Sequence, residues 1–278
     1  MVTKVHFIDV GQGNMVLIEA DNGGIYFFDC NITDENEDDV LQYVANQIDW
    51  YSEINAFICS HRDADHVRGI RKLHAYFPIQ SIWDSNYPGT STTSTEYQQY
   101  MALRRTVGCR VITKKTRNDF GHTRFRYLSA ADDRLAHNAN AQGIVLKVEH
   151  LENGNSSAML PGDSDAETWR AAIMKDYAAA ELSSSILMAG HHGSDSFFDD
   201  PQDEEYYFTR HVQAVSPAMT IVSVGPNQHG HPAANAMKFY SDNSSGSRQG
   251  NKVFRTDKQG NIVLELRPNG AWNLKVRQ

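Results

Sequence analysis

The sequence predicts one α/β domain in which two β-sheets pack together and helices flank them. Short apolar runs of strand length recur along the 278 residues, and segments with helical spacing separate several of them. At least three of these runs end in His or Asp. Because layered α/β folds collect ligands where strand ends meet loops, we expect a metal site along one edge of the sheets.

The composition limits the class of protein. With 40% apolar residues a sizeable core is feasible, and no apolar run reaches the length of a membrane span. The net charge of −8 argues against a nucleic-acid coat protein, although an acidic enzyme can carry a local basic rim. The three cysteines lack CxxC spacing, which predicts neither disulfides nor structural zinc. The N-terminus lacks signal-peptide features, so we expect a cytoplasmic protein without membrane contact.

The first part of the chain predicts a meander, a helix and an α/β step. The helix spans residues 34–50, with acids in its first turn and apolar residues at helical spacing. A second helix is expected at 67–77 and a third at 96–107. Strands are expected at 5–10, 15–19, 24–29, 54–59 and 79–84, with a hairpin turn at 11–14.

The second half repeats this alternation without repeating the sequence. A helix is expected at 166–177, between two strands that run into polar turns. The expected strands are 143–148, 157–160, 185–189, 219–224, 252–256, 261–266 and 271–276.

Positive charge concentrates between Arg104 and Arg126, in an otherwise acidic chain. Two interpretations stay open for this segment. It is either a solvated face that balances neighbouring acids or a rim that binds phosphate, with Arg117 as a candidate substrate-binding residue.

The turn after the strand at 54–59 concentrates metal-binding side chains. His61, Asp63, Asp65 and His66 lie within six positions. Imidazole and carboxylate bind Zn²⁺, Mn²⁺ or Fe²⁺, and packing them in one turn is costly unless a cation neutralises the carboxylates. We therefore predict a metal-binding turn rather than a solvated loop.

This HxDxDH turn resembles the HxHxDH signature of the metallo-β-lactamase superfamily, with Asp63 where most members have His. More narrowly, the chain resembles the C-terminal hydrolase domain of ComEC-type competence proteins and their free-standing relatives. The resemblance implies an αββα sandwich over residues 1–278 and a hydrolase without the transmembrane DNA-transport portion. Six segments carry it in the family's order: FIDVGQGN, SHRDADHVRGI, LPGDSD, AGHHGSDS, VSVGPNQHGHP and FRTDKQGNI.

The resemblance also implies the ligands. His61 and Asp63 would hold one metal, Asp65 and His66 the other, and Asp163 would bridge them. One imidazole of the tandem pair would complete the second site, and we favour His192.

His191 would then orient a ligand or touch substrate, and His231 would lie near the scissile phosphate. Surface or packing roles are expected for His6, His122, Asp165 and His229.

One departure from the superfamily pattern concerns the histidine that many members have before the GD strand. Asn140 matches that position, and His137 is the alternative ligand if the loop register differs. With Asp63 and Asn140 the first site is rich in oxygen, which favours Mn²⁺ or Mg²⁺ over tightly held Zn²⁺. One or two divalent ions, zinc or manganese with magnesium possible, are expected, and the first site could fill only with substrate bound.

The resemblance and the basic segment favour a metal-dependent phosphodiesterase or nuclease that acts on DNA, RNA or a nucleotide. Two divalent ions about 4 Å apart lower the pKa of a bridging water and neutralise a phosphoryl oxygen. Asp65 could accept the proton of that water, and His231 or His191 could stabilise the phosphate or protonate the leaving oxygen.

Two other functions stay open. The same fold could hydrolyse a carboxylic ester, lactone or thioester, which an apolar cleft lined by Trp83, Tyr87 or Phe197 would favour. Alternatively, the chain is a non-catalytic sensor or interaction module that keeps a metal for structure.

Overall fold

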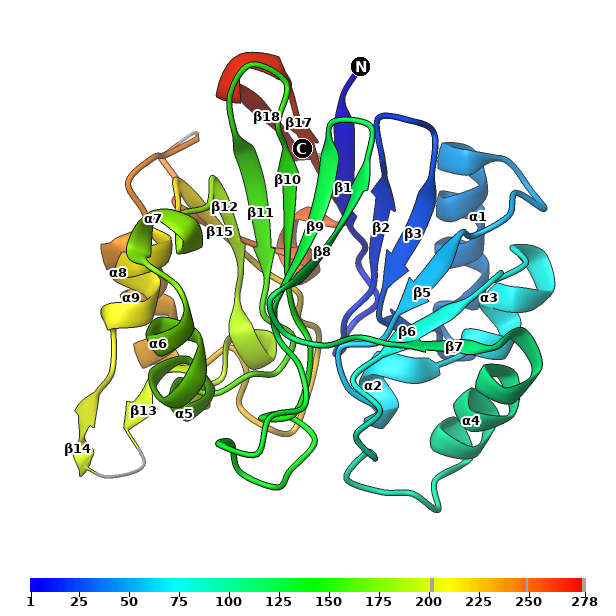
Figure 1. Cartoon of the computed structure of the whole chain (residues 1–278), viewed down its shortest axis with the longest axis horizontal. Coiled ribbons are helices and arrows are strands. Elements are labelled where there is room, and N and C mark those ends of the chain that lie inside the picture. Colours follow the sequence, from blue (N-terminus) through cyan, green and yellow to red (C-terminus); the bar gives the residue numbers. More distant parts are fainter. Residues whose placement is uncertain (201–202, 249, 277–278) are drawn as a thin grey trace.

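The computed structural model describes residues 1–200, 203–248 and 250–276, and in this part of the chain two large sheets pack face to face (Figure 1). The first sheet has the order β18-β17-β1-β2-β3-β5-β6-β7, and β1, β2 and β3 form the predicted antiparallel meander. Its strands are β1 (Thr3–Phe7), β2 (Val16–Glu19), β3 (Ile25–Phe28), β5 (Ala56–Ile58), β6 (Ile82–Asp84), β7 (Cys109–Val111), β17 (Ile262–Leu266) and β18 (Trp272–Val276).

The second sheet has the order β16-β15-β12-β11-β10-β9-β8. In it β11, β12, β15 and β16 are parallel, while β8, β9, β10 and β11 pair antiparallel. Its strands are β8 (Thr116–Phe120), β9 (Thr123–Ser129), β10 (Val145–His150), β11 (Ser156–Leu160), β12 (Ile186–Met188), β15 (Met219–Val222) and β16 (Val253–Arg255). The short strand β4 (Cys30–Asn31) follows β3, and β13 (Asp199–Asp200) pairs with β14 (Asp203–Tyr207).

Helices cover the outer face of each sheet (Figure 1). On the first sheet lie α1 (Glu37–Ile48), α3 (Ile70–Tyr76) and α4 (Thr95–Val107), with α2 (Ala64–Val67) at the sheet's edge. On the second lie α5 (Ala166–Thr168), a π-helix (Trp169–Ile173), α6 (Met174–Asp176), α7 (Ala179–Leu182), α8 (Arg210–Val215) and α9 (Ala234–Asn243). The short α10 (Thr256–Gln259) joins β16 to β17. The predicted architecture of two mixed sheets flanked by helices is confirmed.

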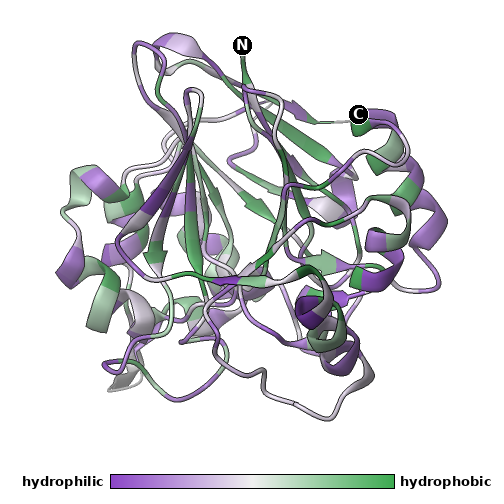
Figure 2. Cartoon of the chain, turned by 45° about the vertical axis from the view of Figure 1, so that its right-hand side comes forward, coloured by the Kyte–Doolittle hydropathy of each residue, from purple (hydrophilic) through white to green (hydrophobic). Residues whose placement is uncertain are grey.

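Among the described residues, three large apolar cores hold these layers together, and a fourth, small cluster contains Leu135, Ala141 and Ala172. On β3, Phe28 faces the core between the sheets and Phe27 faces the core under α1 and α3. On β11, Leu160 faces the central core and Met159 packs under the second set of helices with Trp169. Because both faces of the central strands are covered, their sequences read as continuous apolar runs (Figure 2).

Several predicted elements differ from the structure. The helix expected at 67–77 is divided into α2 and α3 at Gly69, whose φ is +73° and whose missing Cβ would lie 2.5 Å from the carbonyl oxygen of Ile32. The turn expected at 11–14 belongs to a longer loop between Phe7 and Val16.

The basic segment contains three strands, β7, β8 and β9, that were not predicted. On β9, the buried Phe125 and Tyr127 alternate with the half-buried Arg124 and Arg126. This alternation is the period of a strand with one buried face, and the charge of the arginines obscured it. Among the described residues, no helix combines the length and the apolar character that crossing a bilayer requires.

Candidate metal centre

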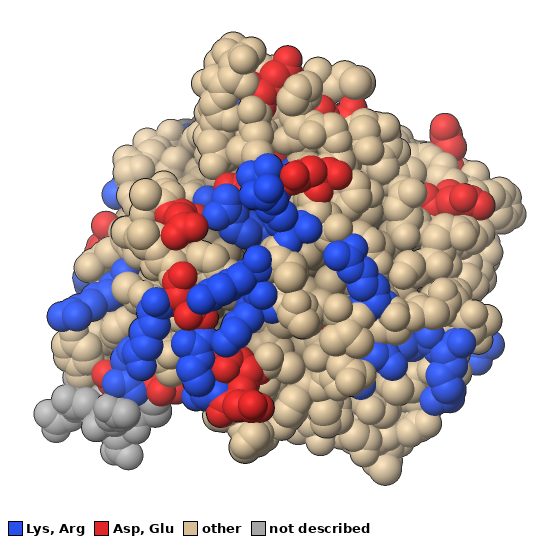
Figure 3. Space-filling view, viewed as in Figure 1, with Lys and Arg blue, Asp and Glu red and all other residues tan. Residues whose placement is uncertain are grey.

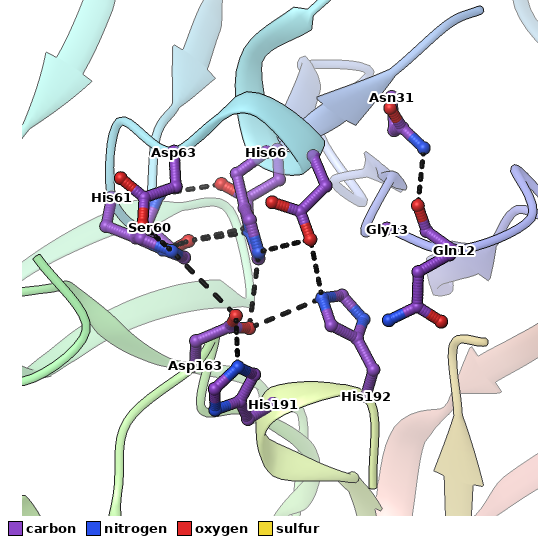
Figure 4. Close-up of polar contacts among 12 residues, drawn as sticks. Gln12, Gly13, Asn31, Ser60, His61, Asp63, His66, Asp163, His191 and His192 are labelled. Carbon is purple, nitrogen blue, oxygen red and sulfur yellow. Dashed lines mark hydrogen bonds and ion pairs between the residues drawn. The ribbon is translucent and has the colours of Figure 1, made fainter. Parts of the chain in front are cut away.

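Three strands of the two sheets end beside one another and carry the polar side chains of the site (Figure 4). His61 follows β5 in the first sheet, and Asp163 follows β11 in the second. The tandem pair His191 and His192 follows β12, which is parallel to β11. The ends of these strands therefore bring residues about 130 positions apart in the sequence to one edge.

One group of side chains contains Asp65 and His66, the expected ligands of the second metal, and is called the second site. It consists of two acids and two histidines. Ligand atoms of Asp65, His66, Asp163 and His192 all lie within 4.8 Å of one another. Oδ1 of Asp163 lies 3.2 Å from Nε2 of His66 and 3.6 Å from Nε2 of His192. Nε2 of His192 lies 3.2 Å from Oδ2 of Asp65.

The other carboxylate oxygen of Asp163 faces a different group, named here the first site. Its Oδ2 lies 3.9 Å from Nε2 of His61 and 3.5 Å from Nε2 of His191. Nε2 of His61 also lies 3.8 Å from Oδ2 of Asp63. Asp163 thus stands between the two groups, with one oxygen toward each.

Every histidine of the two groups is anchored through Nδ1. Nδ1 of His66 lies 2.8 Å from Oδ2 of Asp29, and Nδ1 of His192 lies 3.0 Å from the carbonyl oxygen of Ser223. Nδ1 of His61 lies 3.0 Å from Oγ of Ser60, and Nδ1 of His191 lies 2.9 Å from Oγ of Ser196. These contacts leave each Nε2 directed at the centre, as is typical of metal-binding histidines.

Asp29 was not singled out in the sequence. It is fully buried, and its carboxylate also accepts hydrogen bonds from the backbone N–H and the hydroxyl of Ser60. Its φ of +60° is uncommon for a residue other than glycine. An aspartate at the end of the apolar run of β3 is the signal that could have revealed it.

The residues fit a divalent metal. In the described part of the chain, several buried atoms of the centre have no hydrogen-bond partner: Nε2 of His61, His66 and His192, and Oδ1 of Asp163. Burying such groups without a partner is costly, and native proteins rarely do so. Nitrogen and oxygen donors that converge on one point are the ligands a divalent cation requires.

Charge within the centre favours the same interpretation. Burial acts to raise the pKa of Asp163, but His66 and His192 hold it well below its usual value. Burial acts to lower the pKa of His66 and of His192, but Asp163 raises both. Burial lowers the pKa of His61, and the neighbouring His66 lowers it further. The carboxylate thus stabilises positive charge on the two imidazoles, in the position where a cation would bind.

Other predicted residues surround the centre. His231 precedes Pro232 in a cis peptide, its ring centroid lies 5.4 Å from that of His191, and its Nδ1 is buried without a hydrogen-bond partner. Burial, followed by the charge of His191, lowers the pKa of His231 to about 4. Asn140 lines a cavity beside the first site, whereas His137 is exposed. Asp165 caps α5, since its side chain accepts a hydrogen bond from the backbone N–H of Thr168.

Two cavities flank the centre. The one beside the first site has a volume of about 200 Å³ and is lined by Asp63, Thr90, Asn138, Asn140, Asp165, His191 and Ser196. The one beside the second site has a volume of about 370 Å³ and is lined by Gln12, Ala64, Asp65, Arg68, Pro226, Asn227, Gln228 and His229. Both linings are predominantly polar.

The loop with the GQGN sequence forms one wall of the second cavity. Its Asn14 N–H donates to the carbonyl oxygen of Asp65, and its Gly13 carbonyl accepts from the Ser223 hydroxyl. A Cβ at Gly13 would lie 2.5 Å from the side chain of Asn31, so only glycine fits there. The loop thus ties the candidate ligand Asp65 on α2 to Ser223, the anchor of His192, after β15.

Arg117 lies apart from these cavities. It is on β8, its side chain is 63% exposed, and Lys115, Arg126 and Tyr177 line the same shallow pocket. Trp83 and Phe197 are buried in apolar cores. Neither they nor the half-buried Tyr87 line the two cavities beside the centre, so the apolar cleft that would favour an ester hydrolase is not found there.

No protein-family model matches the chain, and no curated protein matches its sequence. Solved structures do match its fold. The metallo-β-lactamase fold protein YhfI from Bacillus subtilis matches over 95% of this chain and 99% of its own, with a TM-score of 0.56 and 12% identity. A diphosphatase from the PhnP family matches over 95% of this chain and 99% of its own, with a TM-score of 0.51 and 11% identity.

CmlA, a diiron β-hydroxylase from Streptomyces venezuelae, matches over 92% of this chain and 53% of its own, with a TM-score of 0.56 and 11% identity. At such identities the likeness establishes the fold alone. The chain has the metallo-β-lactamase fold, and the αββα sandwich is confirmed. Because a diphosphatase and a hydroxylase share this fold, the activity must be argued from the site.

Proposed function

We propose that the protein is a metal-dependent phosphodiesterase or nuclease, related to the hydrolase domain of ComEC-type competence proteins. The observation that supports this most is the position of Asp163, which offers one oxygen to each of two groups of His and Asp. Phosphoryl-transfer enzymes use such pairs of cation sites to hold the attacking and leaving oxygens of one phosphate.

Divalent ions bound here would supply Lewis acidity that lowers the pKa of a water molecule and neutralises charge on a phosphoryl oxygen. The protein's own residues do the rest. Asp65 is partly exposed toward the second cavity, where it can accept a proton. His231 is neutral at pH 7 because of its low pKa, so it would donate one N–H hydrogen bond to the substrate rather than a full charge.

The two cavities favour a diester over a smaller substrate. One opens at Asp63 and the other at Asp65, so a phosphate at the centre could extend a substituent into each. The polar linings suit sugar hydroxyls and phosphates better than the apolar acyl group of an ester or thioester. The burial of Trp83 and Phe197 further disfavours the ester alternative.

A nucleic acid or nucleotide is the substrate we propose. Lys and Arg side chains gather near the middle of one face of the molecule, but Asp and Glu lie among them (Figure 3). Most of the Lys and Arg side chains predicted to form a rim are in ion pairs. Examples are Arg104 with Asp84, Lys114 with Asp132, Arg124 with Asp119, and Arg126 with Glu149. Arg117 is freer, since the carboxylate oxygen of Asp119 lies 3.9 Å away.

Arg117→Glu therefore tests whether this face binds polyanions. If it does, the variant loses affinity for long oligonucleotides and shows a flatter salt dependence, while cleavage of small diesters is unchanged. Equal loss on both substrates would argue against the proposed role. The cytoplasmic location expected from the sequence stays a prediction.

For the metals we propose one or two divalent ions, Zn²⁺ or Mn²⁺ with Mg²⁺ possible, because both sites offer imidazole nitrogen and carboxylate oxygen.

The activity is tested with metal-loaded protein and matched substrates. We expect cleavage of bis-p-nitrophenyl phosphate and of single-stranded or duplex nucleic acid, and little cleavage of p-nitrophenyl acetate or a thioester. Lys238→Ala, which changes an exposed residue of α9 that lines neither cavity, serves as the control variant. A folded, metal-loaded protein that cleaves none of the phosphodiesters would overturn the proposal.

A further inference from the structure

We propose that the tandem histidines divide between the two metal positions, with His191 completing the first site and His192 the second. His191 would thus replace the histidine that most superfamily members supply before the GD strand. This inference rests on the proposed two-metal function and names the ligand that the sequence left open between Asn140 and His137.

The first site contains one imidazole without His191, whereas the second contains two. His61 is nine-tenths or more buried and its Nε2 has no hydrogen-bond partner, while Asp63 and Oδ2 of Asp163 lie within 4 Å of that nitrogen. Adding His191 would give the first site two imidazoles and two carboxylates, the same donor set as the second. The exposed His137 is poorly placed to be the fourth donor.

Nε2 of His191 faces the carboxylate oxygen of Asp163 that belongs to the first site. That nitrogen lies 3.5 Å from Oδ2, the oxygen that faces His61. The corresponding nitrogen of His192 lies 3.6 Å from Oδ1, the oxygen that faces His66. The two imidazole centroids are 6.2 Å apart and the rings are inclined by 69°, so the neighbouring side chains address different positions (Figure 4).

An unusual backbone produces this division. His191 and His192 both have left-handed conformations, with φ of 47° and 53°. In an extended chain, neighbouring side chains point to opposite sides, whereas two successive left-handed residues turn the chain so that both can face one centre. Such strain persists only where the surroundings impose it, and it clusters at functional sites.

The surroundings do impose it here. The N–H of His191 donates to the carbonyl oxygen of Gly162, the residue before Asp163. The N–H of Gly190 donates to the Tyr240 hydroxyl, and a Cβ on Gly190 would lie 2.2 Å from the ring of Phe197. The turn is therefore fixed against the loop that carries Asp163.

The two positions differ in access. The side chain of His192 is 1% exposed and that of His191 is 27% exposed. His191 also lines the cavity beside the first site together with Asp63 and Asn140. Asp65 of the second site is 33% exposed, but both imidazoles of that site are buried, whereas the first site relies on the partly exposed imidazole of His191. We infer from the imidazoles that the second site fills first and the first site exchanges more readily.

The test is a Mn²⁺ titration of the full chain. Calorimetry measures the number and affinity of the bound ions, and electron paramagnetic resonance detects coupling between neighbouring Mn²⁺ ions. The wild type should bind two ions and show the coupled signal. His191→Ala should bind one ion with an affinity within about threefold of the tighter wild-type site, and lose at least about tenfold at the weaker one. His192→Ala should lose the tighter ion.

Two further variants keep the test decisive. His191→Gly should behave as His191→Ala does, and glycine adopts the left-handed backbone without strain, so it should fold. Asn140→Ala should keep both ions and the coupled signal.

The proposal is overturned if His191→Gly binds two ions with wild-type affinity, if Asn140→Ala loses the weaker ion, or if the wild type binds a single ion. A one-ion protein that cleaves diesters would leave the proposed function standing. A two-ion protein that cleaves none would reject that function and not the ligand assignment.

Discussion

The two halves of the metal centre are built differently although they share Asp163. The second site contains two imidazoles, His66 and His192, whose side chains are at most 1% exposed. Each site opens to a cavity at one carboxylate, Asp63 at the first site and Asp65 at the second. Asp63 depends on a loop residue, since Thr90 donates both its N–H and its hydroxyl to that carboxylate. Buried, anchored donors favour affinity, whereas donors on an open loop favour exchange with solvent and substrate.

The anchors show the same contrast. His66 is held by the fully buried Asp29, and His192 by a backbone carbonyl in the loop after β15. At the first site, Ser60 holds His61 and Ser196 holds His191, both through side-chain hydroxyls, and the Ser60 hydroxyl also donates to Asp29. The second site is therefore preorganised by the fold, and the first depends more on the ions and substrate that reach it.

Asp163→Ala removes the residue that the two sites share and should have the largest effect. We expect phosphodiester cleavage to fall by at least about 10³-fold, and both ions to bind more weakly, because each site loses a carboxylate oxygen. The chain should still fold, since the residue lies at the edge of the sheets. Steady-state kinetics, metal titration and circular dichroism check these outcomes. Unchanged turnover would show that the centre lies elsewhere.

Asp29→Asn should weaken the second site most. The amide is a poorer acceptor for the N–H of His66, so we expect affinity at the second site to fall by about 10- to 100-fold, with a smaller loss at the first, where Ser60 links Asp29 to His61. The free energy of unfolding should fall by about 1–3 kcal/mol, because buried hydrogen bonds to Ser60 are also impaired. Metal titration and chemical denaturation measure both effects. Equal weakening of the two sites would contradict the assigned role.

Lowering the pH should also separate the sites. The pKa values of His66 and His192 are raised in the metal-free protein, so these imidazoles carry protons that an incoming ion must displace. The pKa of His61 is lowered, so this imidazole is already neutral. Each displaced proton costs about tenfold in affinity per pH unit, so second-site affinity should fall about 10- to 100-fold from pH 7 to pH 6. Calorimetry at both pH values would contradict this if the first site fell more steeply.

Thr90→Val should weaken metal binding at the first site only, and its effect should be the smallest of these changes. The variant loses the hydroxyl that donates to Asp63 but keeps the backbone N–H donor. We expect about a fivefold loss of first-site affinity, which corresponds to the roughly 1 kcal/mol of one hydrogen bond. The Mn²⁺ titration reads both sites at once. A larger loss at the second site would show that the two halves are not independent.

The sequence revealed the layers because the central strands are covered on both faces and so read as apolar runs. It missed β8 and β9, where one face of each strand is charged. It also joined α2 and α3, because the contact that stops the helix at Gly69 comes from Ile32, which is distant along the chain.

The candidate site also contains residues that the sequence revealed and residues that it did not. The HxDxDH turn, Asp163 and the tandem histidines stand at strand ends, and the structure brings them together. Asp29, Thr90 and Ser223 escaped notice because they are ordinary residue types whose roles depend on long-range contacts. The direction of each histidine could not be predicted either, since it follows from two left-handed residues in one turn.

The most direct test of the account is a crystal structure of the Mn²⁺-loaded protein, with the ions located by anomalous scattering. The account predicts two ions about 4 Å apart. One should lie among Asp65, His66 and His192, the other beside His61 and Asp63, and Asp163 should contact both. Ions bound away from Asp163, or the absence of any ion among these side chains at saturating Mn²⁺, would contradict it.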